Sequence, residues 1–105
     1  MVAMPQIEEL SREIAREFDP ERIILFGSHA YGTPTEYSDV DLLVIMPFEG
    51  STFRKSVEIA RRIGPAFYVD FVVRSPEDVS RRYREYDPLI REALDHGRVL
   101  YARDN

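Results

Sequence analysis

The chain contains no cysteine, only two histidines and no long hydrophobic run, and each of these absences excludes a class of protein. Without cysteine there are no disulfides and no thiolate zinc sites. With His29 and His96 as the only imidazoles, a histidine-rich metal centre is not expected. No apolar stretch is long enough to cross a membrane, and the N-terminus has no signal-peptide pattern. We therefore expect a cytoplasmic protein without membrane association.

The chain also has little positive charge. It carries 19 acidic and 14 basic residues among 105, a formal net charge of −5. This balance gives no support to general polyanion binding, and direct nucleic-acid binding is not expected. A basic cluster at residues 81–84 (RRYR) is interpreted as a solvated helix face rather than a contact for a nucleotide or an acidic partner. The length predicts one domain over residues 1–105, and any further domain would come from a partner.

Residues 23–46 (IILFGSHAYGTPTEYSDVDLLVIM) are the most informative stretch of the chain. Residues 23–26 and 40–46 are short apolar runs bounded by turn residues, which is typical of buried strands. Asp39 and Asp41 interrupt this pattern at the start of the second run. Because side chains on a strand repeat every second residue, both carboxylates are expected on the same side of a sheet.

Two like charges held together are costly unless a partner compensates for them. Mg²⁺ is a suitable partner because it prefers one or two carboxylates, waters and the oxygens of a substrate phosphate. Gly27-Ser28 ends the first apolar run, twelve residues before Asp39. The loop that follows can present backbone N–H groups and a hydroxyl to an anion. A metal site and a phosphate site would then face one another.

A third acid, Asp70, stands alone in the apolar segment 66–73, which is predicted to form the third strand. Considered by itself, it is more typical of a core carboxylate paired with an arginine such as Arg74. The acid pair at Asp39 and Asp41 favours a role in the same metal site instead.

Helices are predicted where apolar residues recur at helical spacing between start and stop signals. They comprise a helix from Pro5 that stops before Asp19-Pro20, a short segment at residues 29–31, a helix capped by Ser51 or Thr52 and stopped by Gly64-Pro65, one beginning at Ser75-Pro76, and one from Asp87-Pro88 to Gly97. Residues 98–101 resemble a brief edge strand or packing arm. Alternating helices and strands would by themselves suggest a parallel sheet.

Two motifs in this order resemble the signature of a known family. Residues 27–32 (GSHAYG), followed after five residues by 38–42 (SDVDL), resemble the GSxAxG(x5)SDxDL signature of the minimal nucleotidyltransferases of the DNA polymerase beta superfamily. Residues 68–73 (YVDFVV) resemble the hydrophobic-acid-hydrophobic pattern that carries the third carboxylate of that superfamily. The resemblance in layout covers residues 5–101. It implies an α+β domain with a mixed sheet flanked by helices, the polymerase-beta-like palm fold, with the acids on its exposed face.

The resemblance also implies roles for the acids. Asp39 and Asp41 would be ligands of a nucleotide-bound Mg²⁺, and Asp41 would bridge to a second ion. Asp70 would complete the second metal site and accept the proton of the attacking hydroxyl. Two ions together can orient the attacking oxygen and stabilise the leaving group.

The resemblance places the nucleotide at the glycine-serine turn. Gly27 would let the backbone approach phosphate, Ser28 would donate its hydroxyl to a terminal phosphate oxygen, and Ser38 would cap or orient the metal-ligand turn. Two positions depart from the family pattern, because many members carry arginine where this chain has Tyr31 and often where it has His29. One or two cationic phosphate contacts would then be missing.

The activity implied by the resemblance is Mg²⁺-dependent transfer of AMP from ATP to a hydroxyl, expected to be a tyrosine on a protein partner. Small members of the family are antitoxins that modify a HEPN ribonuclease toxin, which implies a HEPN-domain partner and a hetero-oligomer or a homo-oligomer. Two alternatives stay open: a binding module that neutralises its partner by occlusion without catalysis, and a nucleotidyltransferase for a small antibiotic. The sequence does not specify the nucleotide base, the acceptor or the number of units transferred.

Overall fold

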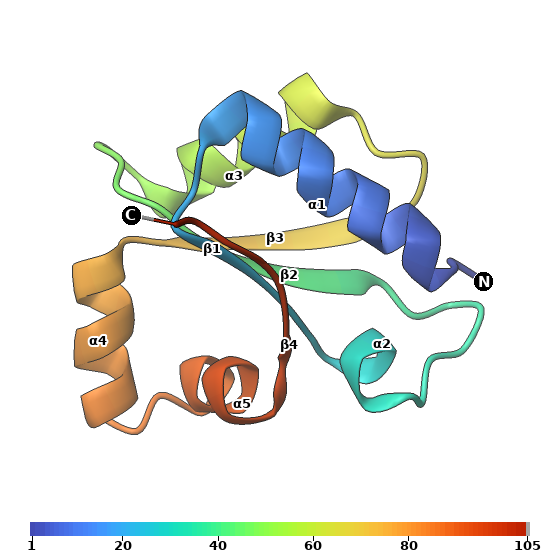
Figure 1. Cartoon of the computed structure of the whole chain (residues 1–105). Helices are drawn as coiled ribbons and strands as arrows, with labels where there is room; N and C mark the ends of the chain where they lie inside the picture. The colour runs from blue at the N-terminus through green and yellow to red at the C-terminus, as the bar shows by residue number, and fades with distance from the viewer. Residues whose placement is uncertain (105) are drawn as a thin grey trace.

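The apolar segments and turn signals produce nine elements in the computed structural model, which describes residues 1–104 (Figure 1). In chain order these are α1 (Met4–Phe18), β1 (Arg22–Phe26), α2 (Ser28–Tyr31), β2 (Val40–Ile45), α3 (Thr52–Ile63), β3 (Val69–Arg74), α4 (Pro76–Arg84), α5 (Pro88–His96) and β4 (Arg98–Ala102). The largest departure from prediction is the start of β3, which begins at Val69 rather than at residue 66. Residues 66–67 form a bend instead, because the chain must turn after Pro65 to enter the sheet.

Side-chain caps begin three of the helices, as their sequences indicate. Ser51, rather than Thr52, caps α3, and its Oγ accepts a hydrogen bond from the Arg54 backbone N at 2.9 Å. Ser75 caps α4 and Asp87 caps α5 in the same manner. Each such cap typically contributes about 1 kcal/mol to stability. The two helices that follow β3 therefore have well-defined starting points.

The four strands form one sheet in the order β3-β2-β1-β4. Strand β1 pairs antiparallel with β2 and with β4, whereas β2 and β3 are parallel. Helix α3 makes the crossover that a parallel pair requires (Figure 1). The sheet is therefore mixed, as the family resemblance implies, and the α+β fold class is confirmed. The all-parallel sheet that simple alternation suggests is wrong.

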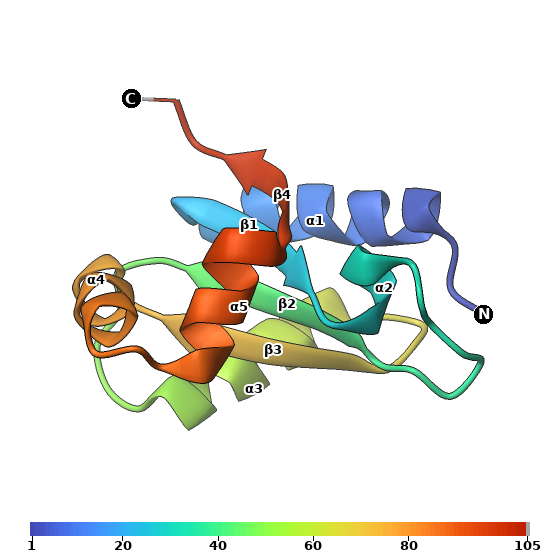
Figure 2. The same ribbon diagram turned by 90° about the horizontal axis from the view of Figure 1, so that it is seen from below.

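Helices cover both faces of this sheet. Helices α1 and α3 pack on one face, and α4 and α5 lie on the other, with α5 crossing β1 (Figures 1 and 2). The core under α1 and α3 contains Ile7, Leu10, Ile14, Ile23, Leu25, Val40, Leu42, Val44, Met46, Ile59 and Val73. A second core under α4 and α5 contains Ile24, Phe26, Leu43, Ile45, Val72, Val79, Ile90 and Ala93. Because Asp41 alternates with Leu43 and Ile45, the acids share the second face. That face is thus partly covered, which corrects the prediction of an exposed one.

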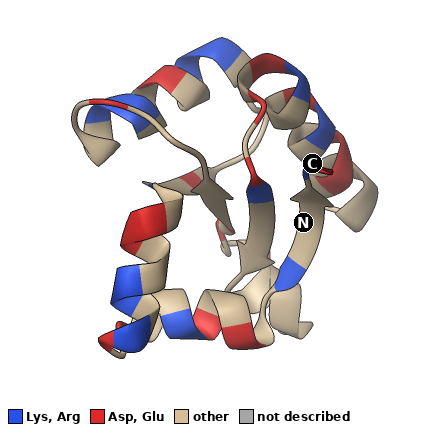
Figure 3. Cartoon of the chain, turned by 60° about the vertical axis from the view of Figure 1, so that its left-hand side comes forward, with Lys and Arg blue, Asp and Glu red and all other residues tan. Residues whose placement is uncertain are grey.

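Most charged residues lie on the helices, and the strands are largely uncharged (Figure 3). The basic cluster of α4 is engaged in ion pairs within the protein. Arg81 and Arg82 both contact Asp78, and Arg82 also lies 3.0 Å from Asp87. These pairs support the interpretation of the cluster as a helix surface. Within residues 1–104, no helix combines the length and the apolar character needed to span a bilayer.

Candidate active site

Asp41 and Asp70 are directly opposed residues in the parallel ladder of β2 and β3. Because neighbouring strands lie about 4.8 Å apart and the two residues share one register position, their side chains project from the same face. Asp41 is partly buried and Asp70 is exposed. Asp39 is also exposed and lies one residue before β2. The three acids singled out from sequence therefore lie near one another where β2 and β3 begin.

Electrostatic coupling within this cluster is visible in the pKa of Asp41. Burial raises the pKa of Asp41, and the negative charges of Asp70 and Asp39 raise it further. Glu92 of α5 adds to the increase in this pKa, and His29 opposes it. A carboxylate surrounded mainly by like charge gives up its proton more readily when a cation is present.

Gly27 brings the end of β1 into contact with the acid cluster. Its φ of +75° suits glycine, and a Cβ at this position would overlap Oδ2 of Asp41 and lie 3.1 Å from Asp41 Cγ. A side chain at position 27 would therefore displace the carboxylate. Ser28 follows as the first residue of α2. The turn predicted to bind phosphate thus lies directly beside the acids predicted to bind metal.

His29 connects this turn to the segment that precedes β2. The side chain is only 8 % exposed, and its Nε2 lies 3.2 Å from the backbone O of Ser38. The hydrogen bond crosses between α2 and the residue directly before Asp39. His29 is thus a buried residue of α2 that is hydrogen-bonded to the segment that leads into Asp39.

Ser38 shapes the loop that leads into β2. Its Oγ accepts a hydrogen bond from the Thr35 backbone N at 2.9 Å and lies 3.3 Å from Thr35 Oγ1. The Ser38 backbone N also donates to the Thr35 carbonyl at 3.1 Å. These contacts lie within the loop and are consistent with the predicted orienting role. Direct contact of Ser38 with a nucleotide stays a prediction.

Two further residues border the cluster: Tyr31, which the motif comparison identified only as a departure from the family pattern, and Glu92, which no motif identified. Burial raises the pKa of Tyr31, the charges of Glu92 and Asp41 raise it further, and the Gly27 backbone amide lowers it. Tyr31 and Glu92 therefore lie close enough to Asp41 to influence its surroundings. Glu92 comes from α5, more than 50 residues along the chain from Asp41, and only the packing of α5 against the sheet reveals its position.

Arg74 does not neutralise Asp70. The Arg74 guanidinium donates to the Val73 carbonyl at 2.8 Å, and its Nε lies 3.9 Å from Asp78 Oδ2. Among the described residues, no ion pair joins Asp70 to a cation. The interpretation of Asp70 as a core carboxylate paired with Arg74 is therefore wrong.

The donor set of the cluster fits a hard divalent cation. Asp39, Asp41 and Asp70 offer only carboxylate oxygens, which Mg²⁺ prefers over sulfur and imidazole ligands. In residues 1–104, no three acidic, histidine or cysteine side chains already enclose a metal-binding position. The raised pKa of Asp41 nevertheless indicates that the neighbouring carboxylates lack compensating positive charge. The arrangement suits a metal held jointly by protein and phosphate oxygens.

Comparison with known sequences identifies related proteins. The model of a family described as "Nucleotidyltransferase domain" matches residues 7–100. A protein of Methanocaldococcus jannaschii named "Putative protein adenylyltransferase MJ1305" is 33% identical over 107 residues. The alignment covers 94% of this chain and 71% of that protein.

Solved structures show the same architecture. A structure described as "a putative nucleotidyltransferase from Sulfolobus solfataricus" is 27% identical, with a TM-score of 0.55, over 73% of this chain and 70% of its own. One described as "the toxin-antitoxin with AMP-PNP" is 20% identical, with a TM-score of 0.58, over 92% of this chain and 74% of its own. At this lower identity the likeness establishes the fold alone.

Proposed function

Because this chain belongs to the nucleotidyltransferase domain family, we propose that it transfers AMP from ATP to a hydroxyl group of a protein partner. The observation that carries this proposal is the direct opposition of Asp41 and Asp70 beside Gly27. It joins two metal-binding carboxylates to a turn that admits phosphate. The proposal treats residues 1–105 as a single catalytic domain.

The reaction requires the nucleophile to be held in line and the phosphate charge to be neutralised. The acceptor oxygen forms a bond to the α-phosphorus, the bond from that phosphorus to the β-phosphate oxygen breaks, and pyrophosphate leaves. Mg²⁺, when bound, supplies charge neutralisation and activates the attacking oxygen. Asp39 and Asp41 would hold the ion of the nucleotide, and Asp41 and Asp70 would hold the second. Asp70 accepts the proton of the attacking hydroxyl.

The β1–α2 turn orients the triphosphate. The Gly27 backbone can approach a phosphate oxygen closely, and the Ser28 hydroxyl can donate a hydrogen bond to it. Tyr31 occupies a position where many family members carry arginine, so phosphate binding relies on metal ions and backbone groups. His29 maintains the spacing between this turn and Asp39 through its contact with Ser38. Ser38 in turn orients the loop.

We infer that the acceptor is a tyrosine of a HEPN-type toxin and that the transfer makes this protein an antitoxin. The name of the M. jannaschii relative supports protein adenylylation, and the structural neighbour described as a toxin-antitoxin with AMP-PNP supports ATP and a toxin partner.

The test compares wild type with Asp41→Asn in the presence of Mg²⁺, ATP labelled at the α-phosphate and a candidate HEPN-domain partner. Wild type should add label to the partner, and intact-mass analysis should show an increase equal to one or more AMP units. Asp41→Asn should add none, because one shared metal ligand is missing. Equal labelling by both proteins would remove the enzymatic proposal.

A second candidate function is neutralisation of the partner by occlusion, without transfer. The observation in its favour is that Tyr31 and His29 stand where many family members carry arginine, so cationic phosphate contacts are missing from the turn. In this case, replacing Asp39, Asp41 and Asp70 together by asparagine would leave complex formation and neutralisation unchanged. An AMP-sized mass increase on the partner would exclude this alternative.

A further inference from the structure

A surface groove leads away from the acid cluster along the turn that precedes β3. A cavity of about 410 Å³ is lined by Asp39 together with Tyr37 and Tyr68. A cavity of about 480 Å³ lies between α1, the end of α3 and the same turn. Ala66 and Phe67 line both cavities, so the two adjoin one another. The groove thus runs from an exposed acid of the candidate site to the surface of α1.

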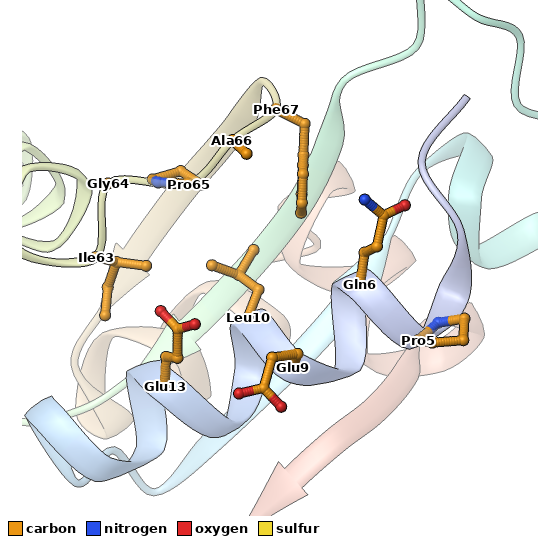
Figure 4. A pocket seen from close by; sticks show the side chains of 10 residues that line it. All are labelled: Pro5, Gln6, Glu9, Leu10, Glu13, Ile63, Gly64, Pro65, Ala66 and Phe67. Carbon is orange, nitrogen blue, oxygen red and sulfur yellow. The ribbon is translucent and has the colours of Figure 1, made fainter.

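Side chains of the second cavity form an apolar floor with acidic edges. Figure 4 shows Leu10, Ile63 and Phe67 between α1 and the turn, with Glu9 and Glu13 along α1. These apolar groups offer a surface on which a bound chain can bury side chains. The groove therefore combines apolar contact area with negative charge at its edge.

The groove lies on the side of the cluster opposite the phosphate turn. In the sheet order, β1 and β3 lie on opposite sides of β2, and Gly27 approaches Asp41 from the β1 side. Tyr68 directly precedes β3, and its carbonyl accepts a hydrogen bond from Val40 N at 3.1 Å. The triphosphate and the Tyr68 end of the groove therefore approach the acids from different sides of β2, and the groove reaches the cluster at Asp39.

The aromatic and acidic side chains of the groove indicate which kind of ligand it can bind. Tyr37 and Tyr68 are 86% and 84% exposed, which leaves both rings free to contact a ligand. Glu36 and Asp39 add negative charge to the first cavity, and neither cavity is lined by lysine or arginine. Glu13 adds negative charge to the second. An anionic ligand such as a nucleic acid or a triphosphate is disfavoured here, and a positively charged ligand is favoured.

Glu9 contributes less to this charge than the other acids do. It lies 2.8 Å from Arg12 and 3.8 Å from Arg16, and these two arginines offset its charge. No ion pair within the described residues engages Glu13, Glu36 or Asp39. These three acids therefore give the groove its negative charge.

We propose that this groove binds the acceptor protein as an extended, positively charged segment, with Tyr37 and Tyr68 on either side of the residue that receives AMP. The inference rests on the proposed function and specifies the acceptor class. The groove supplies the binding energy and directs the acceptor hydroxyl toward Asp70, while the nucleotide enters beside Gly27.

The test uses two synthetic peptides of equal length, each with one central tyrosine, flanked by arginines in one and by glutamates in the other. Fluorescence anisotropy measures the binding of each peptide without ATP. Wild type should bind the arginine peptide roughly tenfold more tightly than the glutamate peptide. Tyr37→Ala and Tyr68→Ala should each weaken arginine-peptide binding by roughly tenfold, because exposed aromatic residues often dominate such contacts.

Phe53→Ala is the matched control, because Phe53 is an aromatic residue of α3 that is 74% exposed and does not line the groove. It should leave peptide binding unchanged. ATP affinity should be unchanged in all three variants. Equal binding of the two peptides, including absence of binding, would overturn the proposal, as would equal losses in Phe53→Ala and Tyr68→Ala. A loss of ATP affinity in Tyr68→Ala would instead place the nucleotide in the groove and also overturn it.

Peptide binding is measured without catalysis, so its outcome is separate from that of the transfer assay. If AMP transfer is absent but the arginine peptide binds in a tyrosine-dependent manner, the groove assignment holds and the proposed enzymatic function fails. If transfer occurs but neither tyrosine affects peptide binding or the KM for the protein acceptor, the acceptor binds elsewhere.

Discussion

Two partly buried aspartates, Asp41 and Asp78, have opposite electrostatic environments. Burial raises the pKa of both carboxyl groups. At Asp41 the neighbouring charges of Asp70 and Asp39 raise the pKa further. Asp41 is therefore held by the fold in surroundings that disfavour its ionised form.

At Asp78 the neighbours have the opposite sign. Burial is the largest single influence and raises its pKa, but the hydrogen bonds and positive charges of Arg82 and Arg81 together outweigh burial, and the net shift is downward. The comparison shows that burial alone does not determine the role of an acid in this protein. The α4 cluster is satisfied within the chain and contributes to stability, whereas the β2–β3 cluster lacks compensation and is suited to external cations.

The largest expected effect is a difference in AMP-transfer activity between variants of Asp41 and Asp78. Asp41→Asn should reduce kcat/KM for AMP transfer by about 10³-fold or more, because it removes a ligand shared by both metal ions. Asp78→Asn should change kcat/KM less than about twofold under conditions where it remains folded, since the ion pairs of Asp78 are with Arg81 and Arg82 of α4 and with Arg74 at the end of β3. Labelled-ATP transfer assays measure both values. A similar loss of kcat/KM in the two variants would show that the different electrostatic environments of Asp41 and Asp78 are unrelated to catalysis.

A second change disturbs Asp41 without replacing it. Gly27→Ala should lower kcat/KM by about 10²-fold, because the new Cβ overlaps Asp41 Oδ2 and displaces the carboxylate. Gly32→Ala is a matched control, since Gly32 has a φ of +78° but no atom within 4 Å of its Cβ position. Both variants carry backbone strain, but only Gly27→Ala should lose activity. Equal activity in the two would argue against close packing of the turn on Asp41.

The third prediction concerns the stability supplied by Asp78. Asp78→Asn should lower the free energy of unfolding by about 1–3 kcal/mol at pH 7, because two arginines lose a charged acceptor. Since the folded-state pKa lies below the ordinary value of 3.8, this stabilisation is present above that value. It is lost as pH falls through the folded-state pKa. Urea unfolding measures the difference in the free energy of unfolding between wild type and Asp78→Asn. This difference should be smaller near pH 3 than at pH 7, and the same difference at both pH values would contradict the prediction.

The smallest expected effect is a gain in stability rather than a loss. Asp41→Asn should raise the Tm of the metal-free protein at pH 7 by a few degrees, because it removes one of several crowded negative charges. A raised folded-state pKa means that stability falls as pH rises from 3.8 through that pKa. The gain in Tm should therefore be present at neutral pH and disappear below about pH 4. Thermal unfolding with EDTA measures the gain, and an unchanged or lower Tm at pH 7 would refute it.

Adding Mg²⁺ extends this measurement. The ion should raise the Tm of wild type more than that of Asp41→Asn, because binding to the folded state stabilises it by mass action. Asp78→Asn should respond to Mg²⁺ as wild type does. The response to metal thereby distinguishes the two acidic clusters independently of activity.

Local sequence signals predict most elements of this fold. Alternation along β2 places Asp41 on the face of Leu43, and the caps Ser51, Ser75 and Asp87 begin the predicted helices. Strand direction could not be predicted from such local signals, because side-chain periodicity is the same in parallel and antiparallel strands. The mixed sheet follows from the family resemblance and not from the alternation of elements.

The surroundings of the site depend on tertiary packing and could not be predicted from local patterns. Glu92 reaches the acid cluster only because α5 packs across β1, and His29 of α2 contacts Ser38 only because the α2–β2 loop folds back against this helix. The packing of α4 and α5 over the acidic face also depends on tertiary structure. Helices α4 and α5 are amphipathic, and their sequences do not specify which face of the sheet they bury.

The in-register pairing of Asp41 with Asp70 limits how the chain length can vary during evolution. A deletion or insertion of one residue at 64–68 that shifted β3 along β2 by one position would turn Asp70 toward α3 and leave an apolar residue opposite Asp41. The loop at 47–51 precedes α3 and does not impose this parity, so homologues can vary there more freely. Natural length variation should consequently be rare immediately before β3 and common after β2.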